Sequence, residues 1–258
     1  MEIDELTAVE KIGNHYYKRD DYFQIHGVRG GKSRSAYQII LKALDLGYKD
    51  FVTAGSRMSP QCEIVSCICE QMGLNAHLFM PSGKETSVIG NINKNKNSVI
   101  HKTKVGYNSV ICHHAEVFAK ENNYYYIPFG MECLENIEIT KKQVQNIPEQ
   151  VKHIVMPCGS GMSMISVIKG LNEYKRFDVS VTGVIVGKSP DNAFKRFLQN
   201  NLFETNMVEY NFVHSQNKYD ETPSVTCVDG LELDPVYESK CIPFMKDGDL
   251  LWIVGKRL

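Results

Sequence analysis

The sequence predicts an α/β fold, with mostly parallel sheets flanked by helices in two interleaved lobes. Short apolar runs of strand length alternate with longer stretches of helical periodicity, and glycine-containing turns separate them. The 258 residues, 43% of them hydrophobic, can form a substantial core. No internal repeat or linker-like segment divides the chain. We therefore expect one unit over residues 1–258, with a small lobe of about 35–130 inserted in a large lobe of 1–34 and 131–258.

The first half of the chain shows the β-α-β order of a parallel sheet. Gly30 and Gly31 allow a chain reversal, and Ser33 or Ser35 can cap the helix that follows. Pro60 stands in the first turn of a second helix, a position that proline tolerates. The predicted strands are 15–18, 50–54, 75–80, 98–102 and 124–128, the predicted helices are 33–46, 60–72 and 107–120, and the Lys/Asn-rich residues 94–97 are expected to form a solvated turn.

The second half continues this alternation. An apolar run at 153–157 indicates a buried strand, and a glycine-rich turn leads from it into a helix that ends near Leu171. We also predict a strand at 179–186, a helix at 192–200 and a final buried strand at 250–254.

The composition argues against a dedicated nucleic-acid or membrane surface. The net charge is −1, and no stretch approaches the length of a membrane-spanning helix. The acidic start without an apolar run predicts no signal peptide, so we expect a cytoplasmic protein. The eight cysteines are scattered without a CxxC pair, as is typical of buried reduced thiols. Cys112-His113-His114 lacks a second ligand cluster, so we expect no metal site.

The stretch VRGGKSRS, residues 28–35, places a lysine where a helix is expected to begin. The helix dipole disfavours a cation at that end, so the position of Lys32 indicates a chemical role. GGKS is similar to the end of a nucleotide-binding P-loop. The first glycine of that motif would have to be residue 26, which is a histidine, so we do not expect a P-loop.

The turn PCGSGMS, residues 157–163, is the second unusual feature. It follows an apolar strand and opens a helix, so its backbone N–H groups could bind a phosphate. A purely structural strand-to-helix turn would have the same sequence pattern. A reactive lysine and a phosphate-binding turn are the pair that pyridoxal phosphate requires, because that cofactor forms a Schiff base with a lysine.

Three further segments extend this indication: YYKRDDYFQIHGVRGGKSR (16–34), FVTAGSRMSPQ (51–61) and LDPVYESK (233–240). Together with PCGSGMS, they resemble the fold-type-II pyridoxal-phosphate enzymes, in particular the branch of 1-aminocyclopropane-1-carboxylate (ACC) deaminase and D-cysteine desulfhydrase. The resemblance implies a fold like that of the tryptophan synthase β subunit and, usually, a homodimer. Pro60 replaces an asparagine of this branch, and residues 222–230 offer no obvious counterpart of its second substrate tyrosine.

The resemblance also implies roles for single residues. Lys32 would bind pyridoxal phosphate and then act as a base, and Glu238 would hydrogen-bond the pyridine nitrogen. Ser59 and Gln61 would contact the substrate carboxylate, and Tyr237 would lie beside the substrate. Ser59 and Tyr237 are also expected to take part in catalysis. The residues implied as phosphate ligands are Gly159, Ser160, Gly161, Met162 and Ser163.

These roles narrow the expected chemistry. A carboxylate at the pyridine nitrogen favours reactions that leave negative charge on the α-carbon. Arg57 could bind an anionic group of the substrate, or it could be an ordinary arginine at the surface or at a helix start. We therefore predict a lyase, deaminase or decarboxylase acting on an amino acid or amino-acid-like group. One version of that group is attached to a larger molecule such as a modified nucleobase, so nucleic acid would enter only as a modified substrate. A β-replacement synthase and an inactive ligand-binding relative are the alternatives.

Overall fold

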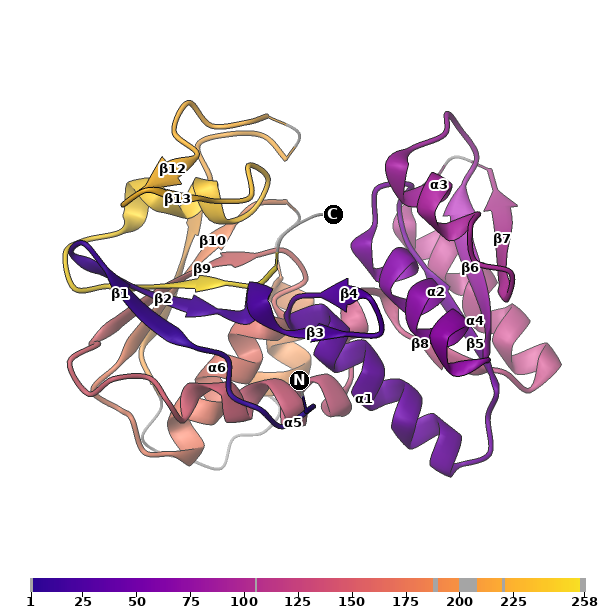
Figure 1. Cartoon of the computed structure of the whole chain (residues 1–258), viewed down its shortest axis with the longest axis horizontal. Helices are drawn as coiled ribbons and strands as arrows, with labels where there is room; N and C mark the ends of the chain where they lie inside the picture. The colour runs from indigo at the N-terminus through magenta and orange to yellow at the C-terminus, as the bar shows by residue number, and fades with distance from the viewer. Residues whose placement is uncertain (1, 105, 188–189, 200–207, 220, 256–258) are drawn as a thin grey trace. The chain divides into compact units, whose positions relative to one another are not determined.

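The computed structural model describes residues 2–104, 106–187, 190–199, 208–219 and 221–255. The chain forms two compact units (Figure 1). Unit 1 comprises Met1–Phe23, Arg29–Gly31 and Ile137–Leu258, and unit 2 comprises Gln24–Val28 and Lys32–Asn136. Both units are built around a sheet with helices packed against it.

Unit 1 contains a six-stranded sheet in the order β1-β2-β14-β9-β10-β11. Only the β1–β2 pair is antiparallel, and every other neighbouring pair is parallel. The strands that flank β9 therefore end at the same edge of the sheet as β9 does. The bounds are β1 Val9–Ile12, β2 His15–Arg19, β9 His153–Cys158, β10 Ser180–Ile185, β11 Tyr210–His214 and β14 Leu250–Ile253.

The central strands of this sheet are buried on both faces. Ile154 and Met156 of β9 pack on one face with Ile165 and Ile168 of helix α6 (Met162–Glu173). Residues at the alternate positions of the strand, including Val155, pack on the other face, beneath the hairpin formed by β12 (Cys227–Val228) and β13 (Leu231–Glu232) (Figure 1). This two-sided burial explains why the strand is a continuous apolar run rather than an alternating one.

Unit 2 contains a four-stranded, fully parallel sheet in the order β7-β6-β5-β8. Helix α2 packs on one face of this sheet, and helix α4 packs on the other. The strands are β5 Asp50–Ala54, β6 Asn75–Pro81, β7 Ser98–Thr103 and β8 Tyr125–Ile127, and the helices are α1 Gly31–Asp45, α2 Pro60–Met72, α3 Ser87–Ile92 and α4 Asn108–Asn122.

The remaining elements are short. They are β3 Gln24–Ile25, β4 Val28–Arg29, β12 Cys227–Val228, β13 Leu231–Glu232, α5 Leu134–Thr140, α7 Asp191–Phe194, η1 Asp20–Tyr22, η2 Phe129–Met131, η3 Lys141–Val144, the π-helical turn η4 Lys195–Gln199 and η5 Glu238–Phe244. Within the described ranges, no helix is long and apolar enough to cross a membrane.

Most of the predicted strands and helices form within a few residues of the expected bounds. Among the strands and α-helices, the sequence patterns missed β1, β3, β4, β11, β12, β13, α3 and α5, which are short or lie in polar surroundings. The predicted helix at 192–200 is divided into α7 and η4, and residue 200 lies outside the described residues.

Candidate functional site

The glycine-rich turn of unit 1 joins β9 to α6. Gly161 precedes the helix with φ +86°, a conformation that L-residues other than glycine rarely adopt. A Cβ atom at Gly161 would lie 2.7 Å from Cβ of Pro190 and 3.0 Å from the ring of Phe194. Because the first turn of a helix has N–H groups without intrahelical partners, this glycine-rich start can bind an anion.

The segment LDPVYESK forms a tight turn beside this strand-to-helix turn. The Asp234 carboxylate accepts hydrogen bonds from the backbone N–H groups of Val236 and Tyr237, at 2.8 and 3.0 Å. The turn places the Tyr237 ring next to the phosphate-binding candidate, since a Cβ atom at Gly159 would lie 3.5 Å from Tyr237 Cε1. These two hydrogen bonds explain the acidic residue at the second position of the motif.

Glu238 follows Tyr237 and is completely buried. Its Oε1 accepts hydrogen bonds from the backbone N–H groups of Val254 at 2.8 Å and Gly255 at 3.4 Å. Its Oε2 is buried and has no hydrogen-bond partner among the described residues. Burial, and secondarily the nearby Asp234 carboxylate, raise the pKa of Glu238 to about 8, although the two backbone donors act in the opposite direction.

The same Val254–Gly255 backbone contacts the two glycines before Lys32. The N–H group of Gly31 donates to the Val254 carbonyl at 2.9 Å. Gly30 has φ +94°, and a Cβ atom there would lie 3.0 Å from Cα of Gly255. A larger residue at position 30 would need a strained φ and would press on the Gly255 backbone, so glycine there permits this close approach. Glu238 and the start of α1 are thereby held by one short stretch of backbone.

In unit 2, Lys32 lies in the first turn of α1 and is half-buried. Its ammonium lies close enough to Cys62 to act on the thiol, and Ser59 hydrogen-bonds that thiol. Burial outweighs both influences and raises the pKa of Cys62 to about 12, so the thiol stays neutral. Unit 2 thus brings together Lys32, Ser59 and Cys62, the last of which was not predicted as a site residue.

Gln61 and Arg57 have contacts of their own within unit 2. The Gln61 amide nitrogen donates to Thr53 Oγ1 and to the Pro128 carbonyl, both at 2.8 Å, and its oxygen accepts from Gly130 N–H at 2.9 Å. Gln61 would therefore have to give up one of these bonds to reach a substrate. Arg57 Nη1 donates to the Lys84 carbonyl at 3.0 Å, on the loop between β6 and α3.

Tyr219 is a candidate that the sequence patterns missed. Its hydroxyl lies 3.2 Å from that of Tyr237, and the two rings meet edge to face. The ammonium of the buried Lys240 donates to the backbone carbonyls of Lys218 and Tyr219 and so fixes this segment. No local sequence pattern indicates this role of Tyr219, because the lysine that fixes the segment lies 21 residues further along the chain.

Residues 2–248 match the protein family described as pyridoxal-phosphate dependent enzyme, and the chain belongs to this family. It is similar to the O-seryl-dTMP PLP-dependent decarboxylase of Salmonella phage ViI, with 23% identity over 193 residues, which cover 65% of this chain and 46% of that protein. The chain thus spans about half the length of that relative. The predicted family and cofactor, and the prediction that the chain is an enzyme, are confirmed.

Two solved structures show the likeness in fold. The crystal structure of an ACC deaminase homologue has a TM-score of 0.81 at 20% identity, covering 97% of this chain and 89% of that one. A hydrogen sulfide-producing enzyme from Fusobacterium nucleatum has a TM-score of 0.70 at 14% identity, covering 98% and 95%. The predicted fold class is therefore confirmed.

Three features of this structure fit pyridoxal phosphate. The unpartnered, buried Oε2 of Glu238 can accept a hydrogen bond from a protonated ring nitrogen. The glycine-rich start of α6 suits a phosphate, and Lys32 provides a primary amine in the first turn of α1. The roles predicted for these and the other site residues stay predictions.

Proposed function

We propose that this chain is a pyridoxal-phosphate-dependent decarboxylase that acts on an amino-acid group carried by a nucleotide. The observation that carries the proposal is Glu238, whose buried Oε2 has no partner among the described residues. A carboxylate so placed keeps a ring nitrogen protonated, and a protonated ring is the stronger electron acceptor. The name of the phage relative, an O-seryl-dTMP decarboxylase, supports the substrate class.

In this proposal, pyridoxal phosphate, when bound, accepts the electron pair that remains on the substrate α-carbon when CO₂ leaves. Lys32 Nζ would hold the cofactor through a covalent bond and later return a proton to the α-carbon. Glu238 Oε2 would hold the ring nitrogen. The phosphate would be bound by Gly159, Ser160, Gly161, Met162 and Ser163.

The substrate contacts are proposed as predicted from the sequence. Ser59 and Gln61 would bind the carboxylate, Arg57 an anionic group, and Tyr237 would lie beside the substrate. Tyr219 joins this set because its hydroxyl contacts that of Tyr237. We also propose that the chain acts as a single catalytic unit, as a homodimer, in the cytoplasm; the resemblance to its family supports the dimer.

The test begins with the visible absorption spectrum of the purified protein and with borohydride reduction, followed by mapping of the labelled peptide. We expect a pyridoxyl group on Lys32. The holoenzyme is then incubated with O-seryl-dTMP, free serine, and O-acetylserine plus a thiol. Release of CO₂ from the nucleotide alone supports the proposal.

The other outcomes separate the alternatives. Turnover restricted to free amino acids refutes the nucleotide-linked substrate, and ammonia or pyruvate would indicate a deaminase or lyase. Product from O-acetylserine and a thiol would indicate a β-replacement synthase. A protein that remains colourless and unlabelled after addition of pyridoxal phosphate would indicate a ligand-binding relative.

A further inference from the structure

Unit 2 carries a concentration of positive charge at one edge of its sheet. Residues 82–104 contain five lysines and one glutamate, in a chain whose net charge is −1. Three of these lysines, Lys84, Lys102 and Lys104, are exposed and lie where β6 and β7 end. Arg57 lies in the loop that follows β5, at the same edge. We call these four residues the basic edge.

The loops that carry the basic edge are tied to one another by hydrogen bonds. The N–H group and hydroxyl of Ser82 both donate to the Thr103 carbonyl, at 2.8 and 2.9 Å. The Thr86 hydroxyl donates to the Arg57 carbonyl at 2.7 Å, and Arg57 Nη1 donates to the Lys84 carbonyl at 3.0 Å. The loops that carry the four cations are therefore linked to one another by hydrogen bonds and hold the cations at defined positions.

The guanidinium of Arg57 packs against the backbone of Gly83, which has no side chain to prevent this contact. A Cβ atom at Gly83 would overlap the guanidinium. Lys102 shares the sheet face of Ile100, which packs in the cluster around α2, whereas His101 contacts α4 through Phe118. Lys102 thus projects on the side where the Arg57 and Lys84 loops lead into α2 and α3, and Lys104 follows directly after the end of β7.

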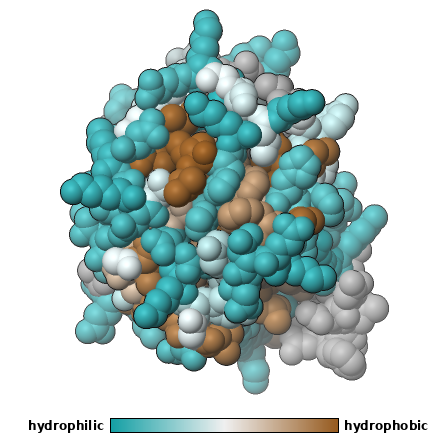
Figure 2. Space-filling model, turned by 90° about the vertical axis from the view of Figure 1, so that its right-hand side faces the viewer, coloured by the Kyte–Doolittle hydropathy of each residue, from teal (hydrophilic) through white to brown (hydrophobic). Residues whose placement is uncertain are grey.

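In the part of the chain that the structure describes, no ion pair neutralises the positive charges of the basic edge. Among the described residues, none forms an ion pair with any of its four members. The one acidic residue of the segment, Glu85, has its carboxylate 4.0 Å from the Cβ position of Gly90 in α3. The face turned toward the viewer in Figure 2 is largely hydrophilic, with smaller apolar areas between the polar side chains.

We propose that the basic edge binds the phosphodiester backbone of a polynucleotide that carries the modified nucleotide. This inference rests on the proposed function and names its substrate as a polymer. A single nucleotide phosphate has a charge of about −2 at most, whereas the basic edge has four cations. A nucleic-acid strand supplies one phosphate per nucleotide, so several cations can be satisfied together. The carboxyl ends of parallel strands are also where open α/β sheets bind ligands.

The test measures binding of the full-length holoenzyme to fluorescently labelled oligothymidylate, single-stranded and paired with oligoadenylate, between about 50 and 200 mM salt. We compare K102Q/K104Q with K94Q/K96Q. Both double variants remove two exposed lysines from unit 2, but Lys94 and Lys96 precede β7 and lie at the opposite edge of the sheet. The plot of log K against log salt has a negative slope, and we expect its magnitude to decrease by about 1.5–2 in K102Q/K104Q. In K94Q/K96Q the slope should be unchanged.

Equal losses in the two variants, or wild-type binding that does not depend on salt, would overturn the inference. So would displacement by thymidine monophosphate at the same total phosphate concentration, because a site for single phosphates would then suffice. Binding does not require turnover, so its failure is distinguishable from failure of the proposed function. If the enzyme decarboxylates the free nucleotide but does not bind the oligonucleotide, the polynucleotide substrate is refuted and the proposed reaction stands. If it binds the oligonucleotide but releases no CO₂, the proposed reaction is refuted and the binding surface stands.

Discussion

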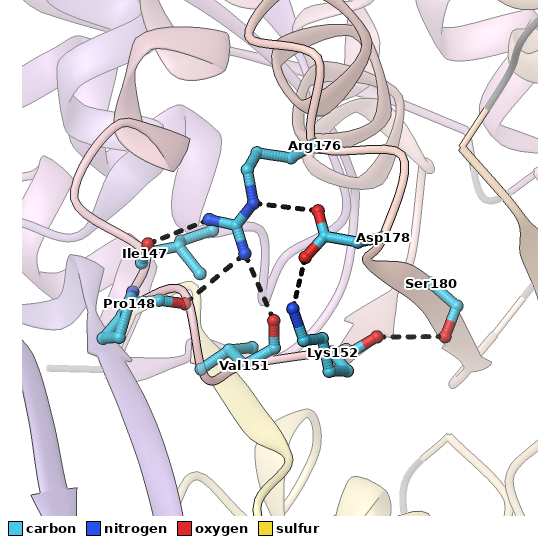
Figure 3. A network of polar contacts seen from close by, with 7 residues as sticks. All are labelled: Ile147, Pro148, Val151, Lys152, Arg176, Asp178 and Ser180. Atoms are coloured by element: carbon cyan, nitrogen blue, oxygen red, sulfur yellow. Dashed lines mark hydrogen bonds and ion pairs between the residues drawn. The ribbon is translucent and has the colours of Figure 1, made fainter.

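The two edges of the sheet in unit 1 differ in how their polar groups are satisfied. At the amino ends of β9 and β10, the Arg176 guanidinium donates to the carbonyls of Ile147, Pro148 and Val151 and to Asp178 (Figure 3). Lys152 donates to the same Asp178 carboxylate at 2.6 Å, and these two cations hold the pKa of Asp178 at about 2. At this edge, the side chains of Arg176, Lys152 and Asp178 find their hydrogen-bond partners among the described residues.

The carboxyl edge of the same sheet differs, because one buried polar atom there has no hydrogen-bond partner among the described residues. Here β9 ends in the glycine-rich turn, and that atom is Glu238 Oε2. Burying a polar group without a partner costs stability, so such a group persists where a ligand supplies the missing partner. The comparison indicates that the amino edge serves folding and the carboxyl edge serves binding. The predictions below test this division.

The largest effect is expected at Lys32, which directly follows the glycines packed on Val254 and Gly255. Lys32→Ala should abolish borohydride labelling and lower kcat by roughly 10³-fold or more, because both the covalent bond and the proton donor are lost. Lys42→Ala, an exposed change in the same helix, is the matched control and should keep both signals. Labelling of another lysine in the wild-type protein would contradict the assignment.

Glu238→Gln should have the next largest effect. The amide keeps the shape of the side chain but removes the negative charge, so kcat should fall about 10²-fold. The absorption spectrum of the bound cofactor should also change, which a merely structural role would not produce. Glu232→Gln, an exposed change in the same unit, should alter neither. Unchanged kcat and spectrum in Glu238→Gln would remove the main support for the proposed chemistry.

Glu238 also predicts how stability depends on pH in the cofactor-free protein. Its pKa is raised from 4.5 to about 8, so the folded state binds more protons than the unfolded state between these values. The free energy of unfolding should therefore fall as pH rises from about 4.5 to about 8, by at most about 1.4 kcal/mol per pH unit. Urea unfolding at several pH values measures this slope, and Glu238→Gln should reduce it.

The sequence predicted those features of the two sheet edges that depend on neighbouring residues in the chain. Apolar runs and glycine turns located β9, α6 and the candidate phosphate site, because strand burial and φ +86° at Gly161 leave direct marks on residue choice. Tyr219 left no such mark, since its place depends on hydrogen bonds from Lys240, far along the chain. The free oxygen of Glu238 also required the structure, because its backbone donors lie 16 and 17 residues away.

A smaller effect on stability is expected at Gly161. Gly161→Ala combines an unfavourable φ with overlap against Pro190 and Phe194, and should cost about 2–4 kcal/mol. Gly248→Ala is the matched control, because Gly248 has φ +87° but no atom within 4 Å of its Cβ position, so about 1–2 kcal/mol is expected. Calorimetric binding should show weaker affinity for pyridoxal phosphate in Gly161→Ala alone. Equal affinities for pyridoxal phosphate in Gly161→Ala and Gly248→Ala would show that the glycine-rich turn does not bind the cofactor.

The smallest effect is expected at the amino edge, and it should be one of stability alone. Arg176→Met leaves the carbonyls of Ile147, Pro148 and Val151 without their donor, so the free energy of unfolding should fall by about 1–3 kcal/mol. Lys152→Met removes only an exposed ion pair and should cause no measurable change. Affinity for pyridoxal phosphate should equal that of the wild type in both variants. If Arg176→Met weakened cofactor binding as strongly as Gly161→Ala, the two edges would be coupled, and folding and binding could not be assigned to opposite ends of the same strands.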